Sequence, residues 1–294
     1  MTWASGSVAN HSAAPYELSC HLCQNPVMAT IVVLHAHPDD EAIATSGTMA
    51  KAKADGHRVV LVVATRGELG QSPDDLAEGE SLADRRTTET LKSAAIIGAD
   101  RVAFLGYRDS GMEDDPRIND LDTFHSADLE SASQRMADIL REEGADILIG
   151  YDERGNYLHP DHIKVHLVGA RAAEIAGTPK VFEATMNRDF LWKLMQQRTQ
   201  GLPPEMQAEV MGNATSVDDF NLGMREWTIT HRVDVAAYVP IKKAAMIAHA
   251  SQINDQSFFL QMPEEMFAES FGQEWFIHRG VSRGTDEPFA DSLL

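Results

Sequence analysis

The sequence predicts an α/β fold in which helices cover both faces of a mostly parallel sheet. Short β-branched runs such as Thr30–Leu34 and Arg58–Ala64 lack polar alternation, as expected for strands that are buried on both faces. Segments of helical length that end at glycine, such as Glu41–Gly56 and Leu82–Gly98, follow these runs. Strands that alternate with such helices indicate a Rossmann-like three-layer sandwich.

The alternation of strands and helices continues to about residue 185. Further strands are predicted at Val102–Leu105, Asp146–Gly150 and Lys180–Thr185, with helices at Ala127–Gly144 and His159–Gly177. Beyond residue 188 the pattern weakens, and we interpret the rest as a C-terminal α+β elaboration of the same domain. The elements predicted there are a helix at Arg188–Met211 with a break at Pro203 and Pro204, a strand at Trp227–Val235, a helix at Tyr238–Ser251 and a last strand at Glu274–His278.

The chain divides into three segments. Hydrophobic residues make up 43% of its 294 residues, which is enough apolar surface for one large domain, predicted at residues 29–283. Residues 1–28 are polar and aperiodic, so we expect a loosely ordered extension. Its two cysteines, Cys20 and Cys23, lack the second pair that a zinc ribbon needs. Residues 284–294 are predicted to form a loose tail.

Charge and hydropathy exclude several classes of partner. The chain has 25 Lys and Arg against 45 Asp and Glu, for a formal net charge of −20, which would be repelled by nucleic acid and by anionic membranes. No apolar run reaches the roughly 18 residues that a membrane span needs. The sequence therefore predicts a soluble, cytoplasmic protein with a small-molecule partner, and it leaves open a homo-oligomer.

The segment His35–Glu41 (HAHPDDE) follows the first predicted strand. Open α/β sheets bind their ligands at this end of the strands. Three acids and two histidines in seven residues would repel one another and desolvate poorly, and a divalent cation removes that penalty. His37 and Asp40 could both reach one ion, whereas Asp39 would project differently and remain free to handle a proton.

A second cluster, Tyr157–His162 (YLHPDH), follows the fourth predicted strand and should face the same crevice. His159 and His162 are one helical turn apart, so one could complete a His-Asp-His site while the other stays unligated. Three protein ligands plus water are typical of catalytic zinc, and ferrous iron also suits such a site. The alternative is an ordinary helix start with Asp161 as an early-turn acid.

The A-H-P-D-D-E and H-P-D-H motifs together resemble those of the PIG-L (LmbE-like) de-N-acetylase family, from about Ala29 to about His278. The resemblance implies an enzyme that uses zinc to hydrolyse an amide, typically the N-acetyl group of an N-acetylglucosamine unit in a small conjugate. The family includes deacetylases of N-acetylglucosaminyl-phosphatidylinositol and of N-acetylglucosaminyl-inositol, and also mycothiol conjugate amidases.

The family resemblance also implies roles for individual residues. The metal ligands would be His37, Asp40 and His162; the general base would be Asp39; His159 would protonate the leaving amine or steady the oxyanion; and Tyr157 would contact that oxyanion. Asp161, as the neighbour of His159, would favour its cationic form and raise its pKa.

Substrate-binding residues are predicted on three further segments. Glu68 lies in the loop Thr65–Gly70 (TRGELG), which is similar to the family's T-x-G-E-x-G loop, and Gln71 replaces an acid found in the mycothiol-pathway deacetylase. Arg86 matches a substrate-binding arginine, with a helix-surface ion pair to Glu89 as the alternative. Asp109 matches an acid that contacts sugar hydroxyls, with a plain Asp-Ser-Gly turn as the alternative.

The sequence leaves other functions open and contains one further motif. A mycothiol S-conjugate amidase is the nearest alternative, followed by a non-catalytic metal- or sugar-binding module. A dinucleotide-binding oxidoreductase would need G-x-G-x-x-G after the first strand, where this chain has A-H-P-D-D-E. His249, in the motif His-Ala-Ser-Gln, also echoes the family, but we interpret it as a buried histidine of a core helix.

Overall fold

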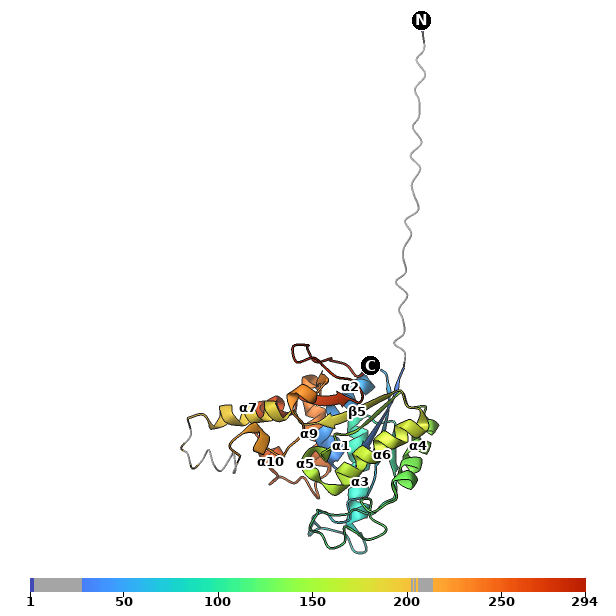
Figure 1. Cartoon of the computed structure of the whole chain (residues 1–294), viewed down its shortest axis with the longest axis vertical. Helices are drawn as coiled ribbons and strands as arrows, with labels where there is room; N and C mark the ends of the chain where they lie inside the picture. The colour runs from blue at the N-terminus through green and yellow to red at the C-terminus, as the bar shows by residue number, and fades with distance from the viewer. Residues whose placement is uncertain (3–27, 202, 204, 206–213) are drawn as a thin grey trace.

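The computed structural model describes residues 1–2, 28–201, 203, 205 and 214–294 (Figure 1). The predictions for Cys20 and Cys23, and for most of the extension 1–28, lie outside the described residues. So does the end of the helix predicted at Arg188–Met211, of which the described part is α7 (Arg188–Thr199).

A seven-stranded sheet forms the centre of the fold. Its strands are β1 (Thr30–His35), β2 (Arg58–Val63), β3 (Arg101–Phe104), β4 (Ile147–Tyr151), β5 (Lys180–Thr185), β6 (His231–Asp234) and β7 (Gln273–His278). They lie in the order β3-β2-β1-β4-β5-β7-β6. The first five strands are parallel, whereas β7 runs antiparallel to both β5 and β6. The predicted mostly parallel α/β fold is confirmed, with an antiparallel C-terminal extension.

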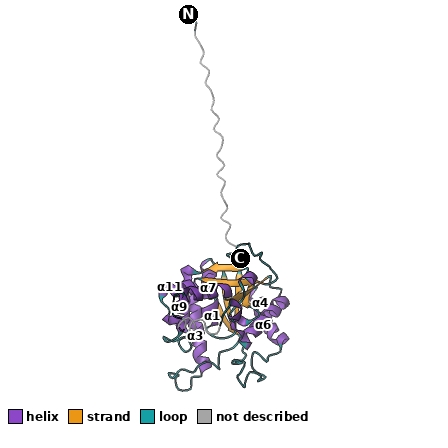
Figure 2. Cartoon of the chain, turned by 60° about the vertical axis from the view of Figure 1, so that its left-hand side comes forward, coloured by secondary structure: helices purple, strands orange, loops and turns teal. Residues whose placement is uncertain are grey.

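The sheet separates two hydrophobic cores, and successive side chains of β1 point alternately into one core and the other. Val32 and Leu34 pack with α4 (Leu129–Glu143) and α6 (Pro160–Ala176) on one face of the sheet. Ile31 and Val33 pack on the other face, where the covering helices are α2 (Ser46–Ala54), α3 (Leu82–Ile97), α9 (Val239–Ala248) and α11 (Glu264–Phe271). Figure 2 shows the orange sheet between these two groups of purple helices. All-apolar strands follow from this burial on both faces.

Several element boundaries differ from the sequence prediction. The single helix expected at Glu41–Gly56 is split into α1 (Asp40–Ala44) and α2, because Thr45 has a non-helical φ of −136° and its hydroxyl lies 2.8 Å from His35 Nε2. Trp227 belongs to a 3₁₀ turn, so the strand expected from it begins only at His231. The remaining short elements are α5 (Gly155–Leu158), α10 (Phe258–Gln261), η1 (Val217–Asp219), η2 (Glu226–Thr228) and η3 (Ala236–Tyr238).

The sheet order places the two sequence motifs beside each other. β1 pairs with β2 on one side and with β4 on the other. The chain leaves β1 toward α1 and α2 on one face of the sheet, and it leaves β4 toward α6 on the opposite face. Such a switch point opens a crevice at the carboxyl ends of the two strands. The segments that follow β1 and β4 carry the two motifs into this crevice.

None of the helices among the described residues is both long and apolar enough to cross a bilayer. The cytoplasmic location and the homo-oligomer stay predictions.

The C-terminal tail is docked rather than loose. Ala290 exchanges backbone hydrogen bonds with Thr230 and Arg232 at the start of β6, and Leu293 is buried. The Phe289 ring lies edge-on to Trp275, with ring centroids 5.2 Å apart. The Arg283 guanidinium lies over the Phe289 ring, 4.1 Å from the ring centroid. The sequence could not show this, because the segment is short and aperiodic and its partners lie far back along the chain.

We expect Phe289→Ala to lower the free energy of unfolding by about 1 kcal/mol, because a half-buried ring loses its contacts. For a domain of this size the melting temperature should fall by about 2–4 °C, as measured by thermal denaturation. Phe258→Ala is the matched control, since Phe258 is 70% exposed. Equal shifts in the two variants would show that the tail does not stabilise the fold.

Candidate active site

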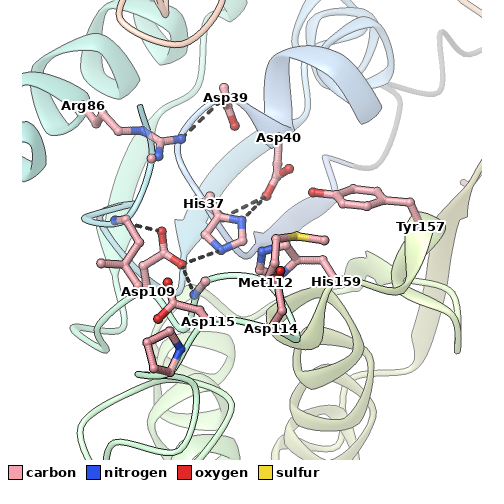
Figure 3. Close-up of a pocket in the computed structure, with 14 residues that line it drawn as sticks. His37, Asp39, Asp40, Arg86, Asp109, Met112, Asp114, Asp115, Tyr157 and His159 are labelled. Atoms are coloured by element: carbon pink, nitrogen blue, oxygen red, sulfur yellow. Dashed lines mark hydrogen bonds and ion pairs between the residues drawn. The ribbon is translucent and has the colours of Figure 1, made fainter. Parts of the chain in front are cut away.

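The loop after β1 turns sharply at Asp39. This residue has a φ of 98° and caps α1, a left-handed conformation that is uncommon for any residue but glycine. Asp40 Oδ2 accepts a hydrogen bond of 2.8 Å from the backbone N–H of His37, so its carboxylate folds back toward the imidazole. The Asp39 and Asp40 side chains consequently point in different directions (Figure 3).

The segment after β4 presents its histidines from the start of α6. His159 is the N-cap of this helix, Pro160 occupies its first turn, and the backbone N–H of Asp161 donates to His159 Nδ1 over 3.1 Å. Gly155 must be glycine, since its φ is +56° and an added Cβ would lie 2.5 Å from the His162 Cβ. Because of this close approach, α5 packs directly against the first turn of α6.

Asp40 lies close to both histidines that are predicted as metal ligands. Asp40 Oδ2 lies 3.4 Å from His37 Nδ1 and 3.3 Å from His162 Nε2. Ligand atoms about 2.0–2.1 Å from a tetrahedral ion are about 3.4 Å from one another, so each of these two separations suits a pair of ligands on one ion. His37, His159 and His162 can also each place one ring nitrogen within 4.8 Å of the others. Among the described residues, the second group whose ligand atoms all lie within 4.8 Å of one another is His37, Asp109 and Asp161, and Asp40 belongs to neither group.

The far side of His37 faces two further carboxylates. His37 Nε2 lies 3.2 Å from Asp161 Oδ2 and 3.5 Å from Asp109 Oδ1. Burial disfavours a charged His37, but its hydrogen bonds to Asp109, Asp161 and Asp40 outweigh burial and raise its pKa. The surroundings that favour a proton on His37 also favour a metal cation on its Nδ1. The residues present thus fit a divalent metal, and the carboxylates behind His37 would orient it.

The structure corrects the expected action of Asp161 on His159. The fully buried Asp161 carboxylate accepts hydrogen bonds from the backbone N–H and the hydroxyl of Ser110 and faces His37. Burial, together with His37 and His162, lowers the pKa of His159 to about 4 and outweighs the attraction of Asp161. The predicted rise in this pKa is wrong, because the cost of burying a charged His159 exceeds the favourable interaction with Asp161.

Arg86 stabilises the loop that carries Asp39. Its guanidinium donates to the carbonyl of Pro38 over 2.5 Å and to that of Gly67 over 2.9 Å, and lies 3.2 Å from Asp39 Oδ2. An added Cβ at Gly67 would come within 2.1 Å of the guanidinium, so this glycine is required. Burial raises the pKa of Asp39 to about 6, although Arg86 opposes the shift.

The alternative of a helix-surface ion pair between Arg86 and Glu89 is wrong. Arg86 is only 4% exposed, and the Glu89 carboxylate instead accepts hydrogen bonds from the backbone N–H and the hydroxyl of Ser251. Arg86 still lines the central cavity, so contact with substrate stays a prediction.

A cavity of about 530 Å³ opens over these groups, a size that suits a small molecule. Asp39, Asp109, Tyr157 and His159 all line it, and their roles toward a substrate stay predictions. Glu68 is not among the lining residues. Its carboxylate accepts the backbone N–H of Asp109 over 3.0 Å, so it supports the turn behind the cavity rather than forming the wall.

One wall of the cavity was not predicted from the sequence. The segment Gly111–Pro116 contributes Met112, Asp114 and Asp115 (Figure 3). These residues carry no recognisable motif, although the run Glu113–Asp115 ending at a proline is typical of an exposed turn. Tyr157 stands at the mouth, 40% exposed, with its hydroxyl 3.3 Å from His162 Nε2. Burial raises the pKa of Tyr157, so its hydroxyl remains a neutral donor.

Comparison with known proteins gives a consistent result. A family model described as "PIG-L: GlcNAc-PI de-N-acetylase" matches residues 32–173. The chain is 34% identical to a 1D-myo-inositol 2-acetamido-2-deoxy-alpha-D-glucopyranoside deacetylase of Acidothermus cellulolyticus, over 90% of this chain and 92% of the relative. It is 35% identical to the protein of the same name from Nocardiopsis dassonvillei, over 83% and 92% of the two chains.

Solved structures show the same fold at lower identity. The N,N'-diacetylchitobiose deacetylase of Pyrococcus horikoshii superposes with a TM-score of 0.52 at 20% identity, over 90% of this chain and 91% of the other. A 4-carboxy-2-hydroxymuconate hydratase of Pseudomonas putida superposes with a TM-score of 0.54 at 18% identity, over 89% and 100%. The fold thus serves a deacetylase and a hydratase, so the fold by itself does not decide the reaction.

The position of Asp161 leads to a prediction about metal affinity. Asp161→Asn should weaken binding of a divalent metal about 10- to 100-fold, because His37 loses the carboxylate that orients it. A competition titration with a chromogenic chelator measures this. Asp114→Asn is the control, since Asp114 belongs to the exposed cavity wall. Unchanged affinity in Asp161→Asn would contradict the orienting role.

Proposed function

Since this chain belongs to the PIG-L family, we propose that it is a metal-dependent de-N-acetylase that acts on an N-acetylglucosamine-containing glycoside. The N-acetylglucosaminyl-inositol of the named relatives is the preferred candidate substrate. One observation carries the proposal: a single oxygen of Asp40 lies between His37 Nδ1 and His162 Nε2, on the floor of a cavity that Asp39 also lines.

We assign the metal to His37, Asp40 and His162. A zinc or ferrous ion held there would supply Lewis-acid activation of a water molecule and of the amide carbonyl. Two imidazoles and one carboxylate are a donor set that both ions accept, and zinc is the ion we expect.

Asp39 suits the role of general base. Its pKa of about 6 leaves it ionised near neutral pH while still basic enough to accept a proton from the attacking water. Arg86, 3.2 Å from Asp39 Oδ2, holds the carboxylate at the cavity wall. As the C–N bond breaks, the proton on Asp39 can pass to the amide nitrogen, so that acetate and a free amine leave.

Tyr157 and His159 are placed to bind the oxyanion. His159 Nδ1 accepts the N–H of Asp161, so in a neutral ring the proton lies on Nε2. A pKa near 4 keeps the ring neutral, which favours hydrogen bonding to the oxyanion over full proton transfer to the amine. The Tyr157 hydroxyl is a second donor, and one such donor contributes about 3 kcal/mol in other enzymes.

The first test is turnover. The purified protein should release a primary amine and acetate from N-acetylglucosaminyl-inositol, and a chelator should abolish the release until zinc or ferrous iron is returned. A fluorescent amine-labelling assay measures this. A mycothiol S-conjugate in the same panel distinguishes the amidase alternative. Metal binding without turnover of any amide would support a non-catalytic module instead.

The second test separates base from ligand. Asp39→Asn should keep the metal content of the wild type and lower kcat by about 100-fold or more, because the proton acceptor is lost. Asp40→Asn should lose metal, as measured by elemental analysis of the dialysed protein. Equal metal loss in both variants would contradict the assignment of Asp39.

A further inference from the structure

A buried histidine that the proposed mechanism does not use lies behind the catalytic loop. His249 follows directly after α9 and is 0% exposed. Its Nε2 lies 2.5 Å from Oε1 of Glu41, which is also 0% exposed and directly follows Asp40. The contact joins residues 208 positions apart in the chain. Neither side chain lines the cavity, so neither can touch a substrate.

The Glu41 carboxylate connects His249 to Asp39. Its Oε2 accepts the backbone N–H of Asp39 over 3.1 Å, and its Oε1 also accepts the Ser93 hydroxyl of α3 over 2.6 Å. A buried carboxylate is stable only when donors surround it, and His249 supplies the donor on the α9 side. The three donors together fix where Oε2 lies, and so where the Asp39 N–H must point.

The backbone N–H that donates to Glu41 belongs to Asp39, whose backbone is strained. Asp39 has a φ of 98°, a conformation that persists in a non-glycine residue only when its surroundings enforce it. Arg86 holds the Asp39 side chain from the cavity side, and Glu41 holds its backbone from the protein interior. Release of the backbone would let the residue relax and swing its carboxylate away from the cavity.

We propose that His249 is a positioning residue for Asp39: through Glu41, it holds the left-handed turn that directs the Asp39 carboxylate into the cavity. The inference rests on the proposed function, in which Asp39 is the general base. It differs from the interpretation of His249 as an ordinary core histidine, which would contribute to stability alone.

The same segment provides a matched control. Ser251, two residues on, is also buried, but it bonds to Glu89 rather than to Glu41. Ser251→Ala therefore removes a buried hydrogen bond between the same segment and α3 without touching the support of Asp39. His249→Gln keeps an N–H donor for Glu41, and Ser93→Ala removes a different donor from the same carboxylate at lower risk to folding.

The experiment compares the metal-loaded variants below their melting temperatures. His249→Ala should lower kcat about 10- to 100-fold with KM and metal content unchanged, since misplacement of a catalytic group costs this much. His249→Gln should recover most of the rate, Ser93→Ala should lose less than His249→Ala, and Ser251→Ala should lower only the melting temperature. Hydrogen exchange followed by mass spectrometry gives an independent reading: the Asp39 amide should exchange faster in His249→Ala and in Ser93→Ala, but not in Ser251→Ala.

Each result bears on one proposal or the other. Unchanged exchange at Asp39 in both His249→Ala and Ser93→Ala overturns the positioning role, whatever the rate. Faster exchange with an unchanged kcat also overturns it, because the turn would then not govern the base. If the wild type hydrolyses no amide but exchange responds as described, the proposed function fails while the structural coupling stands.

Discussion

The cluster of buried carboxylates around His37 is the constraint on which the rest of the crevice depends. The carboxylates of Asp40, Asp109 and Asp161 all lie within 3.5 Å of its ring nitrogens, and all three are buried. Buried carboxylates are costly without a cation. A cation at Nδ1 would lie beside Asp40 and would leave the ring proton on Nε2, which faces Asp109 and Asp161. The turns that follow β1, β3 and β4 can therefore be understood as parts of one electrostatic arrangement.

The location of the site could be predicted from the sequence, because it follows from topology. The two histidine motifs come directly after strands, and the carboxyl ends of parallel strands share one edge of a sheet. Spacing within each motif then predicts which side chains can meet, as with His37 and Asp40. The family and the α/β fold could be recognised in the same way.

The orientation of individual side chains could not be predicted, because it depends on partners far along the chain. The Asp161 carboxylate accepts a hydrogen bond from the hydroxyl of Ser110, 51 residues earlier in the chain. Glu68 supports the backbone of Asp109 instead of lining the cavity. The short C-terminal elements were equally difficult, since α10 and α11 have too few residues for a clear period and are held by packing against the sheet.

The docked tail has a consequence for how copies of the chain can associate. β6 is the last strand of the sheet on one side, and such an edge normally offers its unpaired amides to another chain. Here Ala290 occupies part of that edge through Thr230 and Arg232. The docked C-terminal residues thus block part of the β6 edge against strand-to-strand aggregation. A chain that pairs with this part of β6 would first have to displace Ala290 from Thr230 and Arg232.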